Sequence, residues 1–160
     1  MDQAVKKKAL RLFTYGLYVQ TARHEGELAA GTVNWVSQAS FNPPLVMVAV
    51  KADSHLHTVI ERSGRFALNV LSAEQQSIAQ DFFRPTQVAD QTLNGHPFEE
   101  GPATGAPLLT ELPAWVECQV TDTVKRGDHT VFVAEVIEAG VRDEDAKALD
   151  MWNTGWFYAG

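Results

Sequence analysis

The sequence predicts a mainly β protein in which six strands close into a barrel and two or three short helices interrupt them. Three observations support this fold class. Segments of strand length that are apolar or alternate between apolar and polar residues recur along the chain, turn-forming residues separate them, and only short segments have helical spacing. Barrel closure would leave such a chain without an exposed sheet edge. The length of 160 residues suits a single domain, which we place at residues 1–160.

Local patterns predict the elements of the first half of the chain. Apolar residues spaced three and four apart at the start favour an amphipathic helix. Gly26 can adopt the positive φ of a hairpin turn, Asp53 and Ser54 can cap the start of a helix, and Ser72 with Gln75 has the spacing of a capping box. The expected elements are a helix at 4–13, strands at 16–21 and 28–36, a polar loop at 37–42, a strand at 45–51, a helix at 53–64, a strand at 66–71 and a helix from 72 that ends before Pro85.

Four segments complete this expectation. The strand at 45–51 is apolar almost throughout, which predicts burial on both faces. Residues 85–113 contain many turn formers and are expected to be irregular; a long excursion of this kind is typically functional or lies at an interface. Two long strands follow at 114–124 and 130–141, joined by a tight hairpin. The aromatic residues of 152–158 predict an edge strand or an arm on a partner subunit.

Composition and missing motifs exclude several classes of function. The net charge of −7 and the scattered basic residues argue against nucleic-acid binding. No apolar run approaches the length of a membrane span, no signal peptide is evident, and the single cysteine cannot form an internal disulfide, so we expect a cytoplasmic protein. The sequence contains no glycine-rich dinucleotide fingerprint and no P-loop. Its histidines have no zinc-binding spacing, and we expect no metal site.

Three stretches could instead carry a site. The small polar residues of 32–42 could lie along a flat heterocycle, although a plain polar loop has the same composition. Lys51 at a strand end and Ser54 at a helix start could hold a phosphate, because an ammonium, a hydroxyl and free helical amides would converge there; an ordinary capped helix is the alternative. His129 follows a tight Gly-Asp turn and could contact an anionic ring or a nicotinamide, or could merely decorate a hairpin tip.

Taken together, these stretches resemble the flavin reductase-like family of FMN-binding split barrels, and most closely its flavoredoxin and NAD(P)H:FMN reductase branch. The resemblance covers roughly residues 9 to 141. The motifs that carry it, in order, are Thr14 to Ala22, Asn34 to Ser40, Pro43 to Val46, Lys51 with Asp53-Ser54-His55, Phe66 to Leu71, Gln76, Phe82-Phe83 and Gly127 to Thr130.

The resemblance implies a six-stranded antiparallel Greek-key split barrel, a homodimer and a non-covalent FMN near the subunit interface. It implies that the flavin ring is lined by Thr32, Asn34, Trp35, Val36, Ser37, Ala39 and Ser40, and the phosphate held by Lys51, Ser54, His55 and Thr58. Phe83 and Arg84 would close the pocket, and His129 would lie beside the ring as the catalytic residue.

The function that the resemblance implies is an NAD(P)H-dependent flavin or ferric reductase, with NADH or NADPH as electron donor. A flavin performs the redox chemistry itself, so no separate catalytic acid or base is required. One alternative is a flavoredoxin-type carrier that exchanges electrons with a redox protein partner. Another is a flavin-binding barrel without redox turnover.

Overall fold

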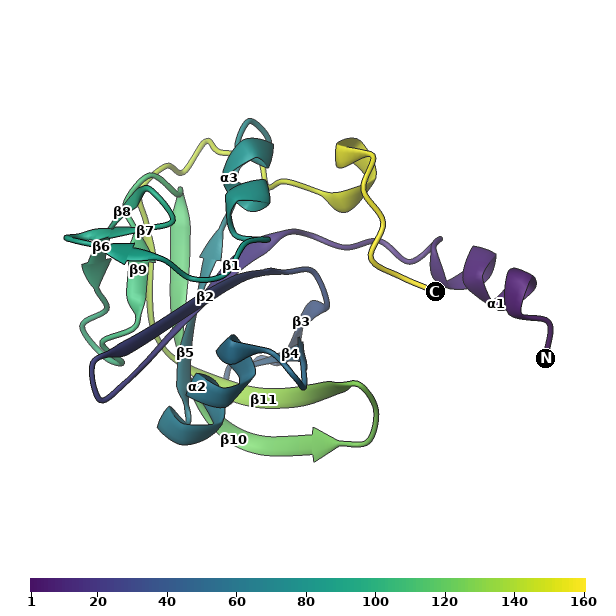
Figure 1. Cartoon of the computed structure of the whole chain (residues 1–160), viewed down its shortest axis with the longest axis horizontal. Helices are drawn as coiled ribbons and strands as arrows, with labels where there is room; N and C mark the ends of the chain where they lie inside the picture. Colours follow the sequence, from purple (N-terminus) through teal and green to yellow (C-terminus); the bar gives the residue numbers. More distant parts are fainter.

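In the computed structural model, which describes all 160 residues, seven antiparallel strands form one continuous curled sheet (Figure 1). Their order is β2-β1-β5-β10-β11-β4-β3, and β2 also contacts β4 across the barrel. The mainly β antiparallel architecture is therefore confirmed, with seven strands where six were expected. The strands are β1 (Tyr18–His24), β2 (Glu27–Val33), β3 (Val36–Ser40), β4 (Leu45–Lys51), β5 (Arg65–Val70), β10 (Ala114–Lys125) and β11 (His129–Val141).

The additional strand is β3, which the sequence predicted as a polar loop. It pairs only with β4 and lies at the end of the sheet, so its side chains remain largely exposed and polar residues are tolerated. The expectation that β4 is buried on both faces was also wrong. Val46, Val48 and Val50 are buried in the barrel, whereas Met47 on the opposite face is 42% exposed. An apolar run thus did not distinguish a strand buried on both faces from one that is buried on a single face.

Residues 85–113 form a second, small sheet rather than an irregular excursion. Its strands are β6 (Val88–Ala89), β7 (Thr92–Leu93), β8 (His96–Glu100) and β9 (Pro107–Leu109). The buried side chain of Asn69 ties it to the barrel: its amide donates to the carbonyl of Val19 at 3.1 Å, and its oxygen accepts from the amide of Leu109 at 2.9 Å. Short strands with tight turns between them are difficult to distinguish from loops in a sequence.

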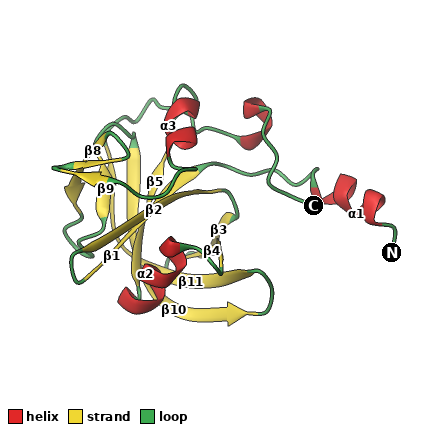
Figure 2. Cartoon of the chain, viewed as in Figure 1, coloured by secondary structure: helices red, strands yellow, loops and turns green.

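Two helices pack against the sheets (Figure 2). In α2 (His55–Ser63), Ser54 caps the start and Gly64 ends the helix at φ 66°, as predicted. The buried face of α2 enters the barrel core beside β1 and β2. Helix α3 (Gln76–Asp81) starts four residues later than expected, although Gln75 still accepts from the amide of Ser72 as in a capping box.

The predicted N-terminal helix is present but ends at Leu10 instead of residue 13, whereas the C-terminal end differs from the expectation. Helix α1 (Gln3–Leu10) buries none of its side chains and extends away from the barrel (Figure 1). The C-terminal residues form no strand. A short 3₁₀ helix, η1 (Met151–Thr154), is followed by an extended tail that returns to the barrel of its own chain. None of the helices has the length and hydropathy that a membrane crossing requires.

Candidate functional site

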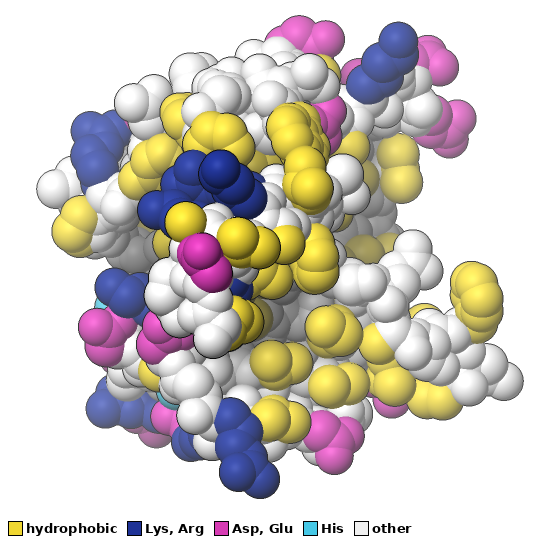
Figure 3. Space-filling model, turned by 90° about the vertical axis from the view of Figure 1, so that its right-hand side faces the viewer, with side chains coloured by type: hydrophobic (Ala, Val, Ile, Leu, Met, Phe, Trp, Pro, Cys, Tyr) yellow, Lys and Arg dark blue, Asp and Glu magenta, His cyan; other side chains and the backbone are white.

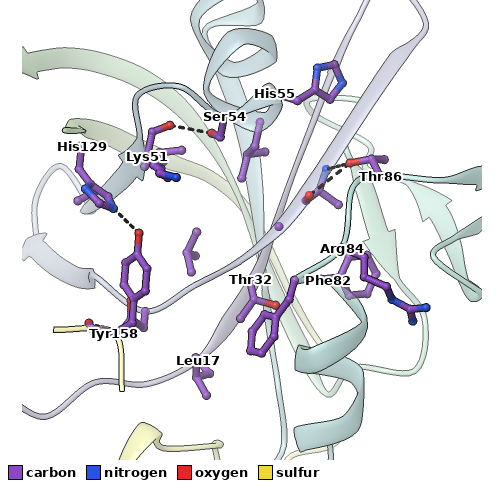
Figure 4. A pocket seen from close by; sticks show the side chains of 18 of the residues that line it. Leu17, Thr32, Lys51, Ser54, His55, Phe82, Arg84, Thr86, His129 and Tyr158 are labelled. Carbon is purple, nitrogen blue, oxygen red and sulfur yellow. Dashed lines mark hydrogen bonds between the residues drawn. The ribbon is translucent and has the colours of Figure 1, made fainter. Parts of the chain in front are cut away.

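A cavity of about 770 Å³ opens between the barrel and the C-terminal tail. This volume lies within the range of small-molecule sites in proteins, roughly 300–1,000 Å³. Its walls are β2, the end of β4, the start of α2, the residues that follow α3, the start of β11 and the tail. Figure 3 shows hydrophobic side chains gathered around a hollow on this side of the molecule, and Figure 4 shows the residues that line the cavity. Apolar side chains form much of its lining and a few polar groups converge on it, as is usual for ligand sites.

One end of the cavity suits an anion. Lys51 ends β4, and its ammonium lies 3.5 Å from the carboxylate of Asp53. The hydroxyl of Ser54 donates to the carbonyl of Lys51 at 2.7 Å and accepts from the amide of His57 at 3.1 Å, which joins the strand to the helix. The amides of His55 and Leu56 in the first turn of α2 have no intrahelical acceptor, so they are available to a ligand.

The other two predicted phosphate ligands point elsewhere. His55 lines the cavity with part of its surface, but its imidazole lies 3.5 Å from the carboxylate of Glu27 (Figure 4). Thr58 lies one turn into α2, outside the cavity lining, and its hydroxyl is 3.4 Å from the carbonyl of Ser54. Of the four predicted phosphate ligands, only Lys51 and Ser54 therefore lie together at this end of the cavity, where Ser54 joins the strand to the helix start.

Strand β2 supplies a polar edge along the middle of the cavity. The hydroxyl of Thr32 donates to the carbonyl of Ala79 at 2.6 Å, which fixes α3 against the strand. Asn34 is 5% exposed, and its amide donates to the carbonyl of Tyr158 at 3.3 Å. Both predicted residues line the cavity, and apolar side chains of Leu17 and Phe82 face it beside them (Figure 4).

The remaining predicted ring contacts lie outside the cavity lining of the single chain. Trp35 lies at the corner between β2 and β3, where its ring centroid is 4.5 Å from that of His129. Its indole N–H is buried without a hydrogen-bond partner. Val36, Ser37, Ala39 and Ser40 follow on the edge strand β3, and the hydroxyl of Ser37 donates to its neighbour's carbonyl.

Phe83 and Arg84 lie at the mouth of the cavity, where the sequence placed them. The ring of Phe83 meets Trp156 edge-on, with the centroids 5.0 Å apart. Arg84 is held by Asp81 at 2.6 Å. Residues that follow α3 thus meet the tail across the opening of the cavity.

His129 lies at the end of the cavity nearest Lys51, held on both sides. Its Nδ1 is 2.7 Å from the carboxylate of Asp128, and its Nε2 is 2.7 Å from the hydroxyl of Tyr158 (Figure 4). The hydrogen bond from His129 lowers the pKa of Asp128, so this carboxylate is ionised at neutral pH. Burial raises the pKa of Tyr158, so its hydroxyl is protonated. The ring therefore has a hydrogen-bond partner at each of its two nitrogens.

This arrangement is consistent with the family model that the chain matches. Residues 10–159 match the model described as the flavin reductase like domain. The chain belongs to the flavin reductase-like family. The family and the flavin reductase activity predicted from the sequence are thereby confirmed.

This flavin reductase is similar to proteins of known activity. It is 33% identical over 147 residues to the NADH-dependent flavin reductase StyB of Pseudomonas fluorescens. The matched region covers 91% of this chain and 83% of the relative. The structure of the NADH:FAD oxidoreductase SgcE6 of Streptomyces globisporus C-1027 is 30% identical, with a TM-score of 0.75, over 86% of this chain and 76% of the other. The bacterial tryptophan halogenase component BorF, described as its flavin reductase, is 28% identical with a TM-score of 0.79, over 98% and 96% of the two chains.

Sequence reasoning missed one wall of the site in this flavin reductase. Met151, Trp156, Phe157 and Tyr158 line the cavity of their own chain, whereas the aromatic tail was assigned to an edge strand or to a partner subunit. The aromatic residues of the tail indicated that it packs against another surface, but they did not show whether that surface belongs to the same chain or to a partner subunit. Phe82, Pro85 and Thr86 also line the cavity but were not predicted as site residues, because no sequence pattern distinguishes them as such.

Proposed function

We propose that this flavin reductase binds FMN without a covalent bond and transfers electrons to it from NADH or NADPH. The observation that supports the choice of FMN is the single anion site, formed by Lys51 and the free amides of α2 at one end of the cavity. A second cluster of that kind, as the pyrophosphate of FAD would require, does not line the cavity. The relative SgcE6 is named for FAD, so the choice of FMN needs its own test.

The residues of the cavity fit the parts of the cofactor. Lys51 and the start of α2 would hold the phosphate, and the apolar middle beside Leu17 and Phe82 would receive the flat ring. The polar edge from Thr32 to Asn34 would face the heteroatoms of the ring. A bound flavin accepts a hydride and passes on electrons, and the protein contributes binding, orientation and exclusion of water.

His129 would act beside the ring as the residue that organises the reacting end. Its imidazole is 13% exposed and faces the cavity between Lys51 and Tyr158, so it is within reach of a second ligand that stacks on the flavin. We propose that this ligand is the nicotinamide. Reduced flavin would then be delivered to an acceptor, free or bound in a monooxygenase or ferric complex. The flavoredoxin-type exchange with a redox protein remains the alternative function.

The proposed assembly is a cytoplasmic homodimer. Exposed aromatic and aliphatic groups near the cavity mouth, among them Phe13, Phe83, Trp152 and Phe157, support an interface on this face. The residues Ser37 to Ser40, which lie away from the cavity of their own chain, would reach a flavin only if a second subunit were to bring its site close to β3. Light scattering at micromolar concentration tests this; a monomeric mass would contradict it.

Titration of the purified protein with FMN and with FAD tests the cofactor assignment. Quenching of flavin fluorescence should give a dissociation constant for FMN at least tenfold below that for FAD. Steady-state oxidation of NADH and NADPH with each flavin then identifies the donor. Equal affinity for the two flavins would contradict the single phosphate site, and absence of flavin binding would contradict the proposed function as a whole.

A further inference from the structure

The C-terminal tail is fastened over the cavity by several different contacts. Gln76 donates to the carbonyl of Thr154 at 3.0 Å, and Trp156 packs edge-on against Phe83. The guanidinium of Arg11 lies 4.7 Å from the centre of the Phe157 ring. These contacts come from the segment around α3 and from the residue after α1, and they hold the tail that carries Tyr158 against the cavity.

The hydroxyl of Tyr158 reaches a specific atom rather than a general surface. It lies 2.7 Å from Nε2 of His129, its backbone carbonyl accepts from Asn34, and its ring lies 5.3 Å from that of Trp35. The phenol is thus fixed at its backbone, its ring and its hydroxyl, while part of its surface forms the cavity wall.

The two partners of His129 set the direction of both hydrogen bonds when its imidazole is neutral. An ionised Asp128 can only accept, so the proton of a neutral imidazole must be on Nδ1. Nε2 then carries a lone pair and can only accept. A protonated phenol supplies the matching donor, and the Tyr158 O–H therefore points at Nε2. Asp128 is 93% exposed, whereas Tyr158 is also held through its backbone and its ring.

We propose that Tyr158 is a positioning residue of this site, which donates to Nε2 of His129 and fixes both the orientation and the Nδ1–H tautomer of that ring. In this structure Nε2 therefore already accepts a hydrogen bond from Tyr158. A ligand that engages this nitrogen must bring a hydrogen-bond donor of its own, such as the N–H of a carboxamide, in place of the phenol. The proposal rests on the proposed function for its catalytic consequence, but not for the geometry of the ring.

The first test requires no flavin. In protein labelled with ¹⁵N in its imidazoles, the His129 resonances, assigned with His129→Gln, should show Nδ1 protonated and Nε2 as a hydrogen-bonded acceptor at neutral pH. Tyr158→Phe keeps the aromatic ring and removes only the hydroxyl, so the Nε2 resonance should shift towards that of a free lone pair. Tyr15→Phe is the matched control, because Tyr15 lies beside the same tail and is not a hydrogen-bond partner of His129. Unchanged His129 resonances in Tyr158→Phe would overturn the proposal.

The second test follows reduction of bound flavin by NADH in the same variants. We expect Tyr158→Phe to lower the maximal rate at least threefold and to change its pH dependence, with the flavin dissociation constant and the KM for NADH within twofold of wild type. If Tyr158→Phe has an unchanged maximal rate and a lower KM for NADH, the hydroxyl only hinders binding of the nucleotide, and the positioning role is overturned. If wild-type protein fails to react with NADH, the proposed function fails, while the NMR result still decides whether Tyr158 sets the state of His129.

Discussion

Replacement of Lys51 by alanine tests the anion site most sharply. A hydrogen bond to a charged group contributes about 1.5–3 kcal/mol. The Lys51 side chain is 59% exposed, and Asp53 already lies 3.5 Å from its ammonium, so we expect the lower end of that range. A loss of about 1.4 kcal/mol corresponds to a tenfold increase in the dissociation constant for FMN. The substitution also leaves the Asp53 carboxylate unpaired near the phosphate, and its repulsion adds to the loss.

The assay is fluorescence titration of FMN at low and at moderate salt. Wild-type affinity should fall as salt screens the exposed ammonium, and Lys51→Ala should be less sensitive to salt. Lys125→Ala is the matched control, because Lys125 is similarly exposed but pairs with Glu61 away from the cavity. The double variant Lys51→Ala/Asp53→Ala should recover part of the affinity. Equal FMN affinity in wild type and Lys51→Ala at low salt would refute the phosphate assignment.

Three further predictions concern other parts of the molecule. Asn69→Ala should lower the free energy of unfolding by about 2–4 kcal/mol in urea titrations, since it leaves buried groups of β1 and β9 unpaired; a change below 1 kcal/mol would contradict this role. Burial, and to a smaller extent the charge of Lys125, lowers the pKa of His57. The unfolded chain therefore binds a proton at this histidine more readily than the folded one, and the free energy of unfolding should fall as the pH drops below about 6.5. His57→Gln should reduce that loss of stability, and an equal loss in both proteins would contradict this role of His57. His129→Ala should retain FMN binding but slow reduction by NADH roughly tenfold in stopped-flow traces, about 1.4 kcal/mol in the barrier; rates equal to wild type would return this residue to a structural role.

His96 should affect the pH dependence of stability in the opposite direction to His57. Burial alone would lower the pKa of His96, but hydrogen bonds and negative charge from Asp81 and Glu111 outweigh it and raise the pKa. The stability that this histidine contributes is therefore present at low pH and is lost as the pH rises through its folded value.

Local chemistry decided how much of this fold was predictable. The caps of α2 at Ser54 and Gly64 follow from side-chain hydrogen bonding and from φ preference, so both ends were correct. Strand β3 was missed because an edge strand exposed to solvent needs no apolar alternation. The small sheet at 88–109 was missed because its strands are two to five residues long and its order comes from tertiary anchors such as Asn69.

The site residues likewise divide into those that local patterns predict and those that depend on distant contacts. Lys51, Ser54 and His129 lie at element boundaries that the sequence predicted, and the structure brings all three to one cavity. The tail could not be placed, because its anchoring depends on partners far away in sequence: Asn34 is 124 residues from Tyr158, and Gln76 is 78 residues from Thr154. No local pattern encodes such contacts.

Anaerobic titration of the FMN-loaded protein with NADH and NADPH tests the central claim most directly. We predict that one equivalent of the preferred nucleotide bleaches the visible absorbance of the bound flavin, and that FMN retention is weakened in Lys51→Ala while the reduction is slowed in His129→Ala. A protein that binds FMN but whose absorbance neither nucleotide changes would contradict the reductase function and favour electron exchange with a protein partner.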